Sequence, residues 1–399
     1  MSKNNNNTPR LRFPGFTGEW EERLVKDICN INTGKSNTQD QVEDGLYPFY
    51  IRSATPVRSN RYLYDCEAVI TIGDGQIGKV FHYVNGKFDL HQRCYMMSNF
   101  KDVDCRYFYY FFSNNFYNRA IRLSAKGTVD SVRLEMISDM PIFLPPTLEE
   151  QQKIAECLMA IDDQISAQSQ KVEALKEKKK GMMQQLLPQK GETTPRLRFP
   201  GFTGEWEEKR LKEIFVLRNG YTPLKGEDSY WTDGEIPWFR MEDIREKGNV
   251  LYDSTQHITQ KAIKGKGCFN ANTIILATSA TIGEHALIKV AHLANQRFVN
   301  LEINPMYSRE ISIEYAYYYM YIIDEICKSI GNIGTFASVS TEALSNLLFV
   351  YPSTFAEQQK IADCLSELDD LIASETKQLE SLKDHKKGLM QQLFPQPAK

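Results

Sequence analysis

The sequence has no apolar run long enough to span a membrane. Its longest apolar stretches, such as Asn346 to Tyr351, are far shorter than the ~20 residues that a bilayer-spanning helix needs. The Asn-rich start of the chain, residues 1–10, also lacks the apolar core of a secretory leader. We therefore expect a cytoplasmic protein with no membrane partner, in which residues 1–10 form a disordered tail.

Residue patterns that hold metals or build active sites are equally scarce. The eight cysteines include no C-x-x-C pair, and the six histidines are scattered without ligand spacing. No G-x-S-x-G nucleophile motif is present either. We therefore predict no metal site and no catalytic residue in this chain, and we expect reduced thiols that serve mainly in packing.

A strong net charge is missing as well. The chain carries 48 basic and 51 acidic side chains, which give a formal net charge of −3. A protein that binds nucleic acid through bulk charge alone would be strongly basic, so that class is excluded. Any nucleic-acid role must depend on local clusters of basic residues or on a partner.

What the chain does contain is an internal duplication. Its 399 residues suffice for two to three globular domains, and Thr8 to Glu22 recur without a change at Thr194 to Glu208, an offset of 194 − 8 = 186. Later landmarks recur in the same order, the first at an offset of 204 and the others at 207: Gln92-Arg93 with Gln296-Arg297, Gly127-Thr128 with Gly334-Thr335, Ser131-Val132 with Ser338-Val339, Glu150 to Leu158 with Glu357 to Leu365, and Lys179 to Pro188 with Lys386 to Pro395. The sequence therefore predicts two related modules.

The two modules differ in their middle parts. The second copy is 207 − 186 = 21 residues longer than the first, and the extra length lies mostly ahead of Gln296. The polar, Gly-rich stretch from Arg218 to Gly248 is typical of an enlarged surface loop. A common frame with unlike loops indicates two modules with different contact surfaces.

Each copy ends in a long amphipathic helix. Apolar residues recur at alternating steps of four and three, which is the heptad pattern of a coiled coil. The predicted seam comprises Ile154, Leu158, Ile161, Ile165, Val172, Leu175, Ile361, Leu365, Leu368, Ile372, Leu379 and Leu382. Polar residues occupy the same ladder at Gln168, Lys179, Glu375 and Lys386. A stripe this narrow needs another such helix for its burial, and the chain supplies one.

The charge pattern predicts that these helices pair in antiparallel orientation. Lys179 would then lie next to Asp369-Asp370, and Lys386-Lys387 next to Asp162-Asp163, whereas a parallel pair would bring like charges together. A ladder from Ile154 to Leu186 (186 − 154 + 1 = 33 residues) would measure roughly 50 Å at ~1.5 Å per residue, or up to ~15 base pairs of DNA.

These patterns predict an α+β protein with pseudo-twofold symmetry. Two related mixed α/β modules, at residues 11–148 and 190–355, would be separated by two long antiparallel helices that form a coiled coil. The helices would occupy residues 149–189 and 356–399.

Basic and amide side chains cluster in the Gly- and Ser-rich loops of both modules. Arg, Gln, Asn and Ser on loops can form hydrogen bonds with base edges in a major groove, although loops are commonly polar for other reasons. The DNA-binding candidates in module one are Lys35, Arg52, Ser53, Arg58, Arg61, Gln76, Lys79, Gln92, Arg93, Lys126 and Arg133. Those in module two are Arg218, Tyr221, Arg240, Arg245, Lys261, Lys264, Ser279, Thr281, Gln296, Arg297 and Thr335.

Two motifs are similar to other kinds of site. Gly73 to Gly78 fits the dinucleotide-binding fingerprint, but the following residues, Val80 to Val84, favour a strand where that fingerprint requires a helix. We therefore predict a strand-turn-strand there. The aromatic runs Tyr107 to Phe112 and Tyr315 to Tyr321, matched at an offset of 207, are more typical of a helical core than of base stacking.

Taken together, the repeated motifs resemble those of the specificity subunit of type I restriction–modification systems. The resemblance covers about Leu11 to Pro395. It is carried by the duplicated RLRFPGFTGEW segment, by G-T-x-x-S-V ahead of each helix, and by the E-Q-Q-K-I-A-x-C-L opening of both helices. The resemblance implies that the modules are target recognition domains, each of which reads one half of a split DNA sequence, and that the two helices are the spacers between them.

The resemblance also implies that this subunit is not an enzyme. Two methyltransferase subunits would dock on it, restriction/translocase subunits would join them, and the complex would bind double-stranded DNA. This chain would hold no cofactor of its own, because S-adenosylmethionine, ATP and Mg would belong to the partner subunits.

Two other classes of protein remain as alternatives. A stand-alone DNA methyltransferase or nuclease is disfavoured because the (N/D)-P-P-(Y/F) box of adenine methyltransferases is absent. A protein-only coiled-coil adaptor, which would share the long helices, is the second alternative and stays open.

Overall fold

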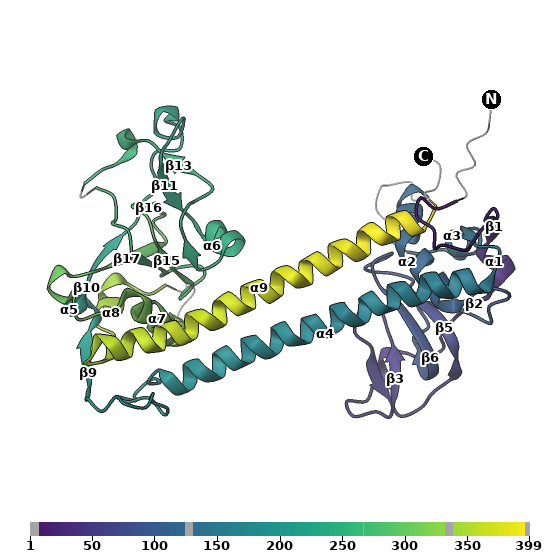
Figure 1. Ribbon diagram of the computed structural model, residues 1–399, viewed down its shortest axis with the longest axis horizontal. Helices are drawn as coiled ribbons and strands as arrows, with labels where there is room; N and C mark the ends of the chain where they lie inside the picture. The colour runs from purple at the N-terminus through teal and green to yellow at the C-terminus, as the bar shows by residue number, and fades with distance from the viewer. Residues whose placement is uncertain (1–7, 124–130, 266, 332–337, 396–399) are drawn as a thin grey trace. The chain divides into compact units, whose positions relative to one another are not determined.

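The computed structural model describes residues 8–123, 131–265, 267–331 and 338–395. The chain folds into two compact units. Unit 1 contains Met1–Gln170 and Thr376–Lys399, and unit 2 contains Lys171–Glu375. Each unit therefore holds one module together with parts of both long helices (Figure 1). Most of the expected N-terminal tail lies outside the described residues. In the described segments, no helix combines the length and apolar character that crossing a bilayer requires.

Unit 1 is built around a six-stranded sheet with the strand order β2-β7-β5-β6-β3-β4. The strands are β2 (Asn30–Thr33), β3 (Tyr47–Tyr50), β4 (Val57–Ser59), β5 (Tyr64–Ile72), β6 (Phe81–Leu90) and β7 (Cys94–Ser98). A two-stranded ribbon joins β1 (Glu21–Leu24) to β8 (Pro141–Leu144). The shorter helices are α1 (Val25–Ile28), η1 (Thr38–Asp40) and α3 (Leu134–Ser138), and the aromatic helix α2 (Cys105–Arg122) packs on the sheet through contacts such as Phe81 with Phe112.

Unit 2 repeats this plan with additions. A five-stranded sheet, β10-β17-β14-β15-β12, is accompanied by a three-stranded sheet, β13-β11-β16, and by the ribbon β18-β9. The strands are β9 (Trp206–Arg210), β10 (Phe215–Asn219), β11 (Ile236–Phe239), β12 (Val250–Leu251), β13 (His257–Ile258), β14 (Thr273–Ala277), β15 (His285–Ile288), β16 (Leu293–Ala294), β17 (Phe298–Ile303) and β18 (Leu348–Pro352). The helices are α5 (Leu211–Ile214), η2 (Asp228–Tyr230), α6 (Met241–Lys247), η3 (Gln260–Ala262), η4 (Pro305–Tyr307), α7 (Ile313–Gly331) and α8 (Thr341–Ser345).

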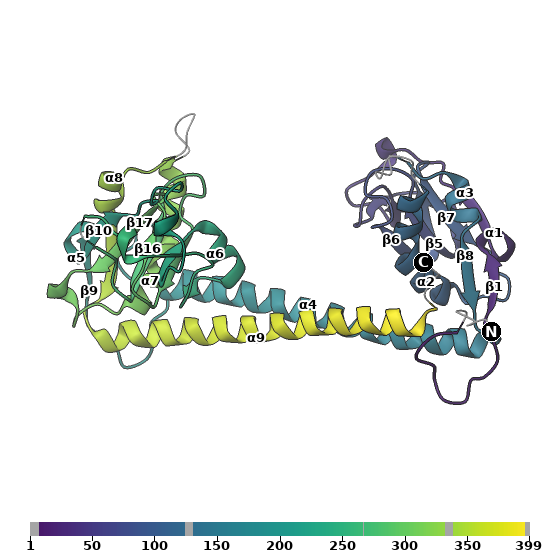
Figure 2. The same cartoon turned by 90° about the horizontal axis from the view of Figure 1, so that it is seen from above.

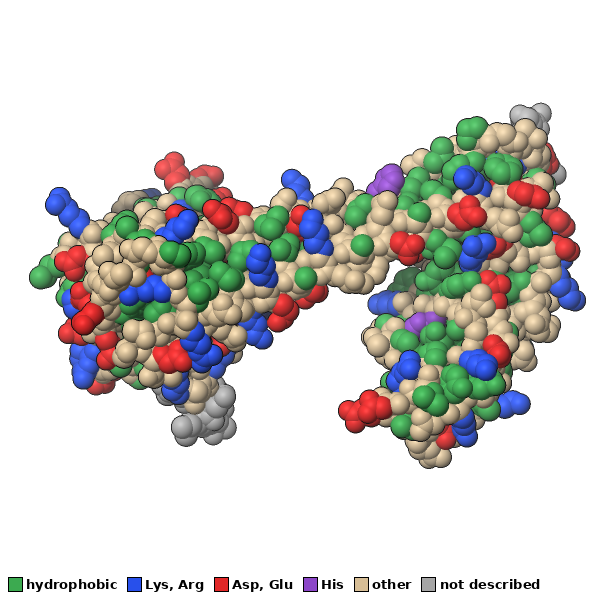
Figure 3. All heavy atoms as spheres, turned by 60° about the horizontal axis from the view of Figure 1, so that its bottom comes forward, with side chains coloured by type: hydrophobic (Ala, Val, Ile, Leu, Met, Phe, Trp, Pro, Cys, Tyr) green, Lys and Arg blue, Asp and Glu red, His purple; other side chains and the backbone are tan. Residues whose placement is uncertain are grey.

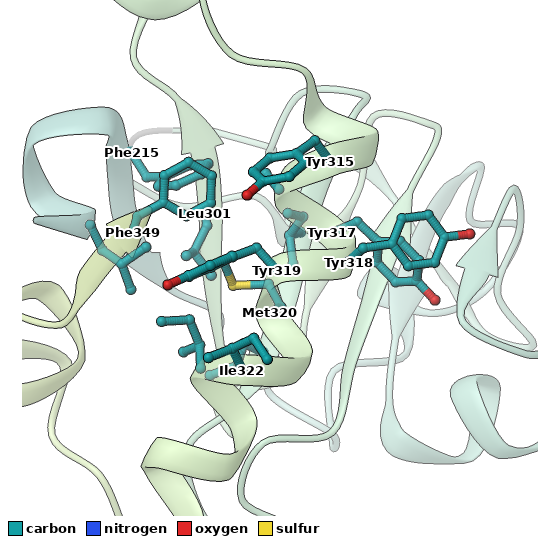
Figure 4. Close-up of a cluster of buried hydrophobic side chains, with 14 of the residues drawn as sticks. Phe215, Leu301, Tyr315, Tyr317, Tyr318, Tyr319, Met320, Ile322 and Phe349 are labelled. Carbon is teal, nitrogen blue, oxygen red and sulfur yellow. The ribbon is translucent and has the colours of Figure 1, made fainter. Parts of the chain in front are cut away.

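The aromatic runs form the helical cores of both units, as the sequence predicted. In unit 2, the rings of Phe215, Tyr315, Tyr319 and Phe349 gather between α7 and the neighbouring strands (Figure 4). The Tyr107 hydroxyl donates to the Phe143 carbonyl at 2.5 Å, and the Tyr315 hydroxyl donates to the Val350 carbonyl at 2.8 Å. These two tyrosines correspond at an offset of 315 − 107 = 208 rather than 207, because the offset rises from 204 at the Gln-Arg turn to 208 in α7 and falls to 207 after that helix.

The segment that fits a nucleotide fingerprint is a hairpin. Strands β5 and β6 pair antiparallel from Tyr64 opposite Phe88 to Thr71 opposite Phe81, so Gly73 to Gly78 join two strands and open no helix. Gly75 and Gly78 adopt positive φ angles of 87° and 66°, which glycine tolerates without strain. In unit 2, Ala280 and Gly283 adopt the same left-handed conformation in the turn between β14 and β15. The predicted strand-turn-strand is confirmed.

The long helices are α4 (Leu148–Leu186) and α9 (Phe355–Leu393). Segments of the two helices lie side by side within each unit (Figure 1, Figure 2). All twelve predicted seam residues are buried or half-buried, and Gln168 and Glu375 are 9% exposed.

Ion pairs confirm the antiparallel orientation. In unit 1, Lys386 Nζ lies 2.6 Å from Asp162, and in unit 2, Lys179 Nζ lies 2.6 Å from Asp369. The hydroxyl of Tyr110 donates to the same Asp162 carboxylate, and that of Tyr318 donates to Asp369. Both units therefore contain the same tyrosine, aspartate and lysine cluster.

The C-terminal end of each long helix completes the hydrophobic core of the module that belongs to the other copy of the repeat. In unit 1, the ring of Phe394 lies 5.6 Å from those of Tyr107 and Phe111, and Leu393 belongs to the same buried cluster. In unit 2, Leu186 and Leu187 join the cluster around α7. The repeated closing segments, Lys179 to Pro188 and Lys386 to Pro395, are thus exchanged between the two copies.

The repeated opening segment of each copy forms hydrogen bonds with the end of the long helix that packs against the same module. The Leu11 N–H donates to the Gln392 carbonyl at 3.0 Å, and the Leu197 N–H donates to the Gln185 carbonyl at 2.9 Å. The guanidinium of Arg12 then forms two hydrogen bonds with Glu150, of 2.7 and 2.8 Å. Arg198 and Glu357 repeat this pairing at 2.6 and 2.7 Å. The opening and closing segments of the duplication are therefore parts of one interlocking joint.

The prediction of a single enlarged loop from Arg218 to Gly248 is wrong. This stretch contains the end of β10, the strand β11 and the helix α6. The sequence shows no clear helical pattern here, because only Met241, Asp243 and Ile244 of α6 are buried and its other residues are polar and face solvent. The pattern of a short, mostly exposed helix differs little from that of a loop.

A buried charge on the seam should disrupt the pairing of α4 with α9. Ile161 and Leu368 are 8% and 9% exposed, so an Asp at either position would place a carboxylate among apolar side chains at a cost of ~3 kcal/mol. We expect Ile161→Asp and Leu368→Asp to lower the melting temperature of the purified chain by about 6 °C or more. Ser169→Asp and Ser374→Asp, on exposed positions of the same helices, are matched controls. Equal melting of all four variants would contradict the pairing.

The arginine joints should be equally important in the two units. The carboxylates of Glu150 and Glu357 are 1% exposed, so removing the guanidinium leaves a buried charge without its partner at a cost of ~3 kcal/mol. We expect Arg12→Ala and Arg198→Ala each to lower the urea midpoint of unfolding. Arg10→Ala, at an exposed position two residues earlier, should leave the midpoint unchanged, and a shift as large as that of Arg12→Ala would count against the joint.

Candidate nucleic-acid interface

Three segments of each module converge on the repeated Gln-Arg turn. In unit 1, the Gly73 N–H donates to the Arg93 carbonyl at 2.7 Å, and the Val132 N–H donates to the Gly73 carbonyl at 2.7 Å. In unit 2, Thr278, Arg297 and Val339 form the same two bonds at 3.0 and 2.9 Å. The backbone therefore joins the end of a central strand, the Gln-Arg turn and the start of the Ser-Val landmark. We call this arrangement the clamp of each module.

In unit 1, a carboxylate organises the side chains around the clamp. Asp74 accepts hydrogen bonds from Arg93 at 2.8 Å and from Arg52 at 3.1 Å. Burial raises the pKa of Asp74, but the hydrogen bonds from Arg93 and Arg52 outweigh it and hold the pKa below its ordinary value. The two guanidinium groups remain 60% and 44% exposed. This group presents two cations on loops while one carboxylate fixes their positions.

In unit 2, a pocket of about 550 Å³ lies beside the clamp. Its wall contains Gln296 and Arg297 of the turn, the adjacent Asn295, and Thr222, whose hydroxyl donates to the Gln296 side chain. Serine 279 occupies the place that Asp74 has in unit 1. Within the described part of the chain, the Arg297 side chain forms no ion pair and extends into solvent.

Aromatic and charged residues complete this pocket. Trp231 and Trp238 meet edge to face at 5.0 Å, and the guanidinium of Arg240 lies 5.8 Å from the centre of the Trp238 ring. The nearest carboxylate to Arg240 Nε is that of Glu242 at 3.9 Å, which is too far for a hydrogen bond. Arg240 Nε is therefore a buried donor without a partner among the described residues.

Several predicted DNA-binding residues of module one lie on the loops that adjoin the clamp. They are Lys35, Arg52, Ser53, Gln76, Gln92 and Arg93, and all except the half-buried Ser53 are exposed. Backbone bonds connect these loops, since Lys35 N–H donates to the Leu90 carbonyl and Gln92 N–H to the Ser36 carbonyl. Lys79 follows the same turn, with its Nζ 5.9 Å from the Tyr117 ring.

Other predicted residues of module one are engaged in the fold. Arg58 donates to the carbonyls of Gly45 and Leu46, and Arg61 pairs with Asp40 at 2.9 Å and with the buried Asp89 at 3.4 Å. Arg133 precedes α3 and donates to the Leu123 carbonyl. Lys126 lies outside the described residues. The structure thus separates exposed candidates near the clamp from arginines that hold loops together.

In module two, the predicted residues divide in the same way. Tyr221, Arg240, Ser279, Thr281, Gln296 and Arg297 lie on segments joined to the clamp or lining the pocket. Arg218 is paired with Glu302 at 2.7 Å and stacked 4.2 Å from the Phe269 ring, so it stabilises the sheet. Arg245 lies on α6 at 3.6 Å from Glu284, whereas Lys261 and Lys264 lie in or after η3. Thr335 lies outside the described residues.

Sequence reasoning missed the groups that position the cations. A single acidic residue in a loop, such as Asp74, does not show in the sequence that it positions cations, and Trp231, Gln256 and Asn295 are isolated in the sequence. The glycines on either side of Asp74 were an available signal, because Gly73 and Gly75 mark a turn directly after a predicted strand.

No group of three or more His, Cys, Asp and Glu side chains is arranged to hold a metal ion among the residues that the structure describes. The buried His285 and His292 have pKa values lowered to about 4 by burial, so both are neutral at pH 7. Burial also raises the pKa of Cys29 and Cys94 to about 12, as expected for thiols that serve in packing.

On the face shown in Figure 3, basic and acidic side chains are interspersed over the surface of each unit. This distribution agrees with the small net charge of the sequence. Attraction of a polyanion would therefore depend on local groups such as the clamps.

Comparison with known families places the chain in one of them. The family model described as "Type I restriction modification DNA specificity domain" matches residues 17–177 and 203–384, once for each module. The chain belongs to this family. The resemblance that the sequence motifs indicated is therefore confirmed.

Individual relatives carry the same description. The type I restriction enzyme EcoprrI specificity subunit of Escherichia coli is 42% identical over 169 residues, which span 41% of this chain and 42% of that protein. The type I restriction enzyme MjaVIII specificity subunit of Methanocaldococcus jannaschii is 24% identical over 413 residues, which span 96% of this chain and 93% of that protein.

Solved structures support the fold. A crystal structure of the S subunit of a type I restriction–modification system from M. genitalium aligns with a TM-score of 0.66 at 17% identity, and the alignment covers 98% of this chain and 100% of that chain. At this identity the likeness establishes the fold alone. The predicted arrangement of two mixed α/β modules with long helices is therefore confirmed.

The Asp74 group generates a prediction about pH. Because the folded-state pKa is lowered below 3.8, the stabilisation is present above that value and is lost as the pH falls through the folded pKa. In a ¹³C NMR titration of the purified chain, Arg93→Gln should raise the Asp74 midpoint, since one hydrogen-bonded cation is removed. Arg58→Gln is the control, because the Arg58 guanidinium donates to the Gly45 and Leu46 carbonyls and forms no ion pair with Asp74 among the described residues. An unchanged midpoint in Arg93→Gln would contradict the assignment.

Proposed function

We propose that this chain is the DNA sequence-specificity subunit of a type I restriction–modification complex. Each module would contact double-stranded DNA through the loops around its clamp, and each would read one half of a bipartite target. The observation that carries this proposal is the repetition of one clamp in two modules whose surrounding loops differ. The proposed site of action is the cytoplasm, where such a complex would meet the chromosome.

The chemistry of the clamps supports contact with DNA. Exposed arginine and glutamine side chains can form hydrogen bonds with phosphates and with base edges. The Arg52 and Arg93 pair has one carboxylate for two cations, and the unit 2 pocket is lined by Lys225, Arg240 and Arg297 against the single acid Glu242. Both places therefore have a local excess of positive charge in a chain whose net charge is −3.

The proposed role is non-catalytic. This chain would act as a reader of DNA and as a scaffold for two methyltransferase subunits and for restriction/translocase subunits. S-adenosylmethionine, ATP and Mg would belong to those partners. The recurrence of the joint and of the tyrosine, aspartate and lysine cluster in both units supports a scaffold that offers equivalent surfaces to two copies of a partner.

Methylation mapping tests this proposal. We expect the chain, co-purified with its methyltransferase partner, to direct methylation to one bipartite sequence with an unread gap. Exchange of residues 190–355 for the module of a relative should change one half of that sequence and leave the other half intact, because each module reads separately.

Other outcomes would favour the alternative classes. A continuous methylated motif would contradict the bipartite reading. Unaltered methylation after the module exchange would favour a protein-only adaptor, and methylation or cleavage by the purified chain alone would show that it is an enzyme.

A further inference from the structure

The two modules share part of their loop surface and differ in the rest. Strand pairing shows which residues correspond. His91 N–H donates to the Tyr50 carbonyl in unit 1, and Asn295 N–H donates to the Phe239 carbonyl in unit 2, so Tyr50 corresponds to Phe239 at an offset of 239 − 50 = 189. The Gln-Arg turn follows directly in both units and is therefore part of the shared frame.

The segment after this strand is not shared. In unit 1, Phe49 is paired with Val57, and in unit 2, Trp238 N–H donates to the Gln256 carbonyl. Val57 therefore corresponds to Gln256, at an offset of 256 − 57 = 199. Module two has ten more residues between these strands than module one, since the offset rises from 189 to 199. This added segment contains α6 and β12.

The added segment and its neighbours form much of the pocket wall. Arg240, Met241 and Glu242 come from its start and Gln256 from its end, while Trp231 comes from the loop before β11. The Gln256 side chain is exposed and forms no hydrogen bond among the described residues. Together these residues offer a guanidinium, a carboxylate and an amide beside an aromatic surface, which are the groups that distinguish base edges.

Two features of the pocket point to a bound anion or polar ligand. Among the residues that the structure describes, Arg240 Nε is a buried donor with no hydrogen-bond partner, and such a donor is costly unless an acceptor arrives. The backbone of Arg240 is held independently of its side chain, because its N–H donates to Asp243 at 2.8 Å and its carbonyl accepts from the Asp243 N–H at 3.2 Å. The backbone of Arg240 therefore holds the start of the helix, while its side chain lies 3.9 Å from Glu242 and 5.8 Å from the Trp238 ring and leaves Nε without a hydrogen bond among the described residues.

The arginine of the Gln-Arg turn, which both modules share, is expected to contact DNA differently from the residues of the pocket. Arg93 and Arg297 occupy the same turn in two modules whose neighbouring loops are unlike. A residue that is the same in both modules does not account for a difference between their half-sites, whereas every half-site presents the same phosphate backbone. Phosphate contacts position a protein on DNA without carrying sequence information.

We propose that the module-two pocket, through Arg240 and Gln256, reads bases of the duplex and sets the specificity of its half-site, whereas Arg297 and Arg93 hold phosphates. This inference rests on the proposed function and adds to it the division between specifying and positioning residues. Module one lacks the added segment, so its specificity depends on its own loops around Arg52 and Gln76.

The test uses the full chain in complex with its methyltransferase partner and a library of DNA duplexes that vary every position of both half-sites. Arg240→Gln and Gln256→Ala should each relax one or two positions of the module-two half-site, with a loss of discrimination of ~10-fold at those positions, and should leave the other half-site unchanged. Arg297→Gln and Arg93→Gln should weaken binding to all sequences alike and lower the slope of log affinity against log salt by about 1.

Arg309→Gln is the matched control, because Arg309 is an exposed arginine of unit 2 outside the pocket and should alter neither discrimination nor the salt slope. The inference is overturned if both pocket variants retain the full module-two sequence preference, or if Arg297→Gln relaxes that preference without changing the salt slope. Circular dichroism of each variant separates these results from misfolding. Failure of the wild-type complex to prefer any bipartite sequence would instead refute the proposed function itself.

Discussion

The burial of each long helix end in the module of the other copy is the interaction on which the rest of the structure depends. Leu393 and Phe394 complete the core around Tyr107, while Leu186 and Leu187 complete the core around Tyr315. Neither module therefore has a finished core made only from its own copy. Because the same joint is made twice, the opening and closing segments must fit both partners. This requirement gives a physical reason for their near identity, whereas loops that take no part in the joint can differ freely.

Polar groups select the antiparallel orientation of the long helices, whereas the stability of their interface comes mainly from burial of apolar side chains. The ion pairs of Lys386 with Asp162 and of Lys179 with Asp369 are only partly buried, so each contributes little to stability. A parallel pairing would lose both of them and would bring like charges together. Tyr110 and Tyr318 bind the same carboxylates from the aromatic helices, and they thereby connect the register of the long helices to the packing of each module.

The sequence predicted much of the fold, whereas it left open which basic side chains are exposed and which are paired. Heptad spacing and charge order were sufficient for the seam and for the antiparallel direction, because both are local patterns with one period. The same approach failed for Arg218 to Gly248, where a short, exposed helix has no clear period. Among the predicted DNA-binding residues, Arg93 and Arg297 lie at the clamps, but Arg58, Arg61 and Arg218 bind carbonyls or carboxylates of the fold. A basic residue in a sequence does not reveal whether its charge is already paired.

The sequence by itself determined that the chain is duplicated, where the long helices run, which of their faces are buried and which family the motifs resemble. These are properties of order and period along the chain. Only the tertiary structure showed that the helix ends pack in the module of the other copy and that Asp74 forms hydrogen bonds with two arginines. It also showed that an added segment lines a pocket beside the Gln-Arg turn of module two. Each of these features joins residues far apart in the sequence. Such contacts depend on packing in three dimensions, which no local pattern specifies.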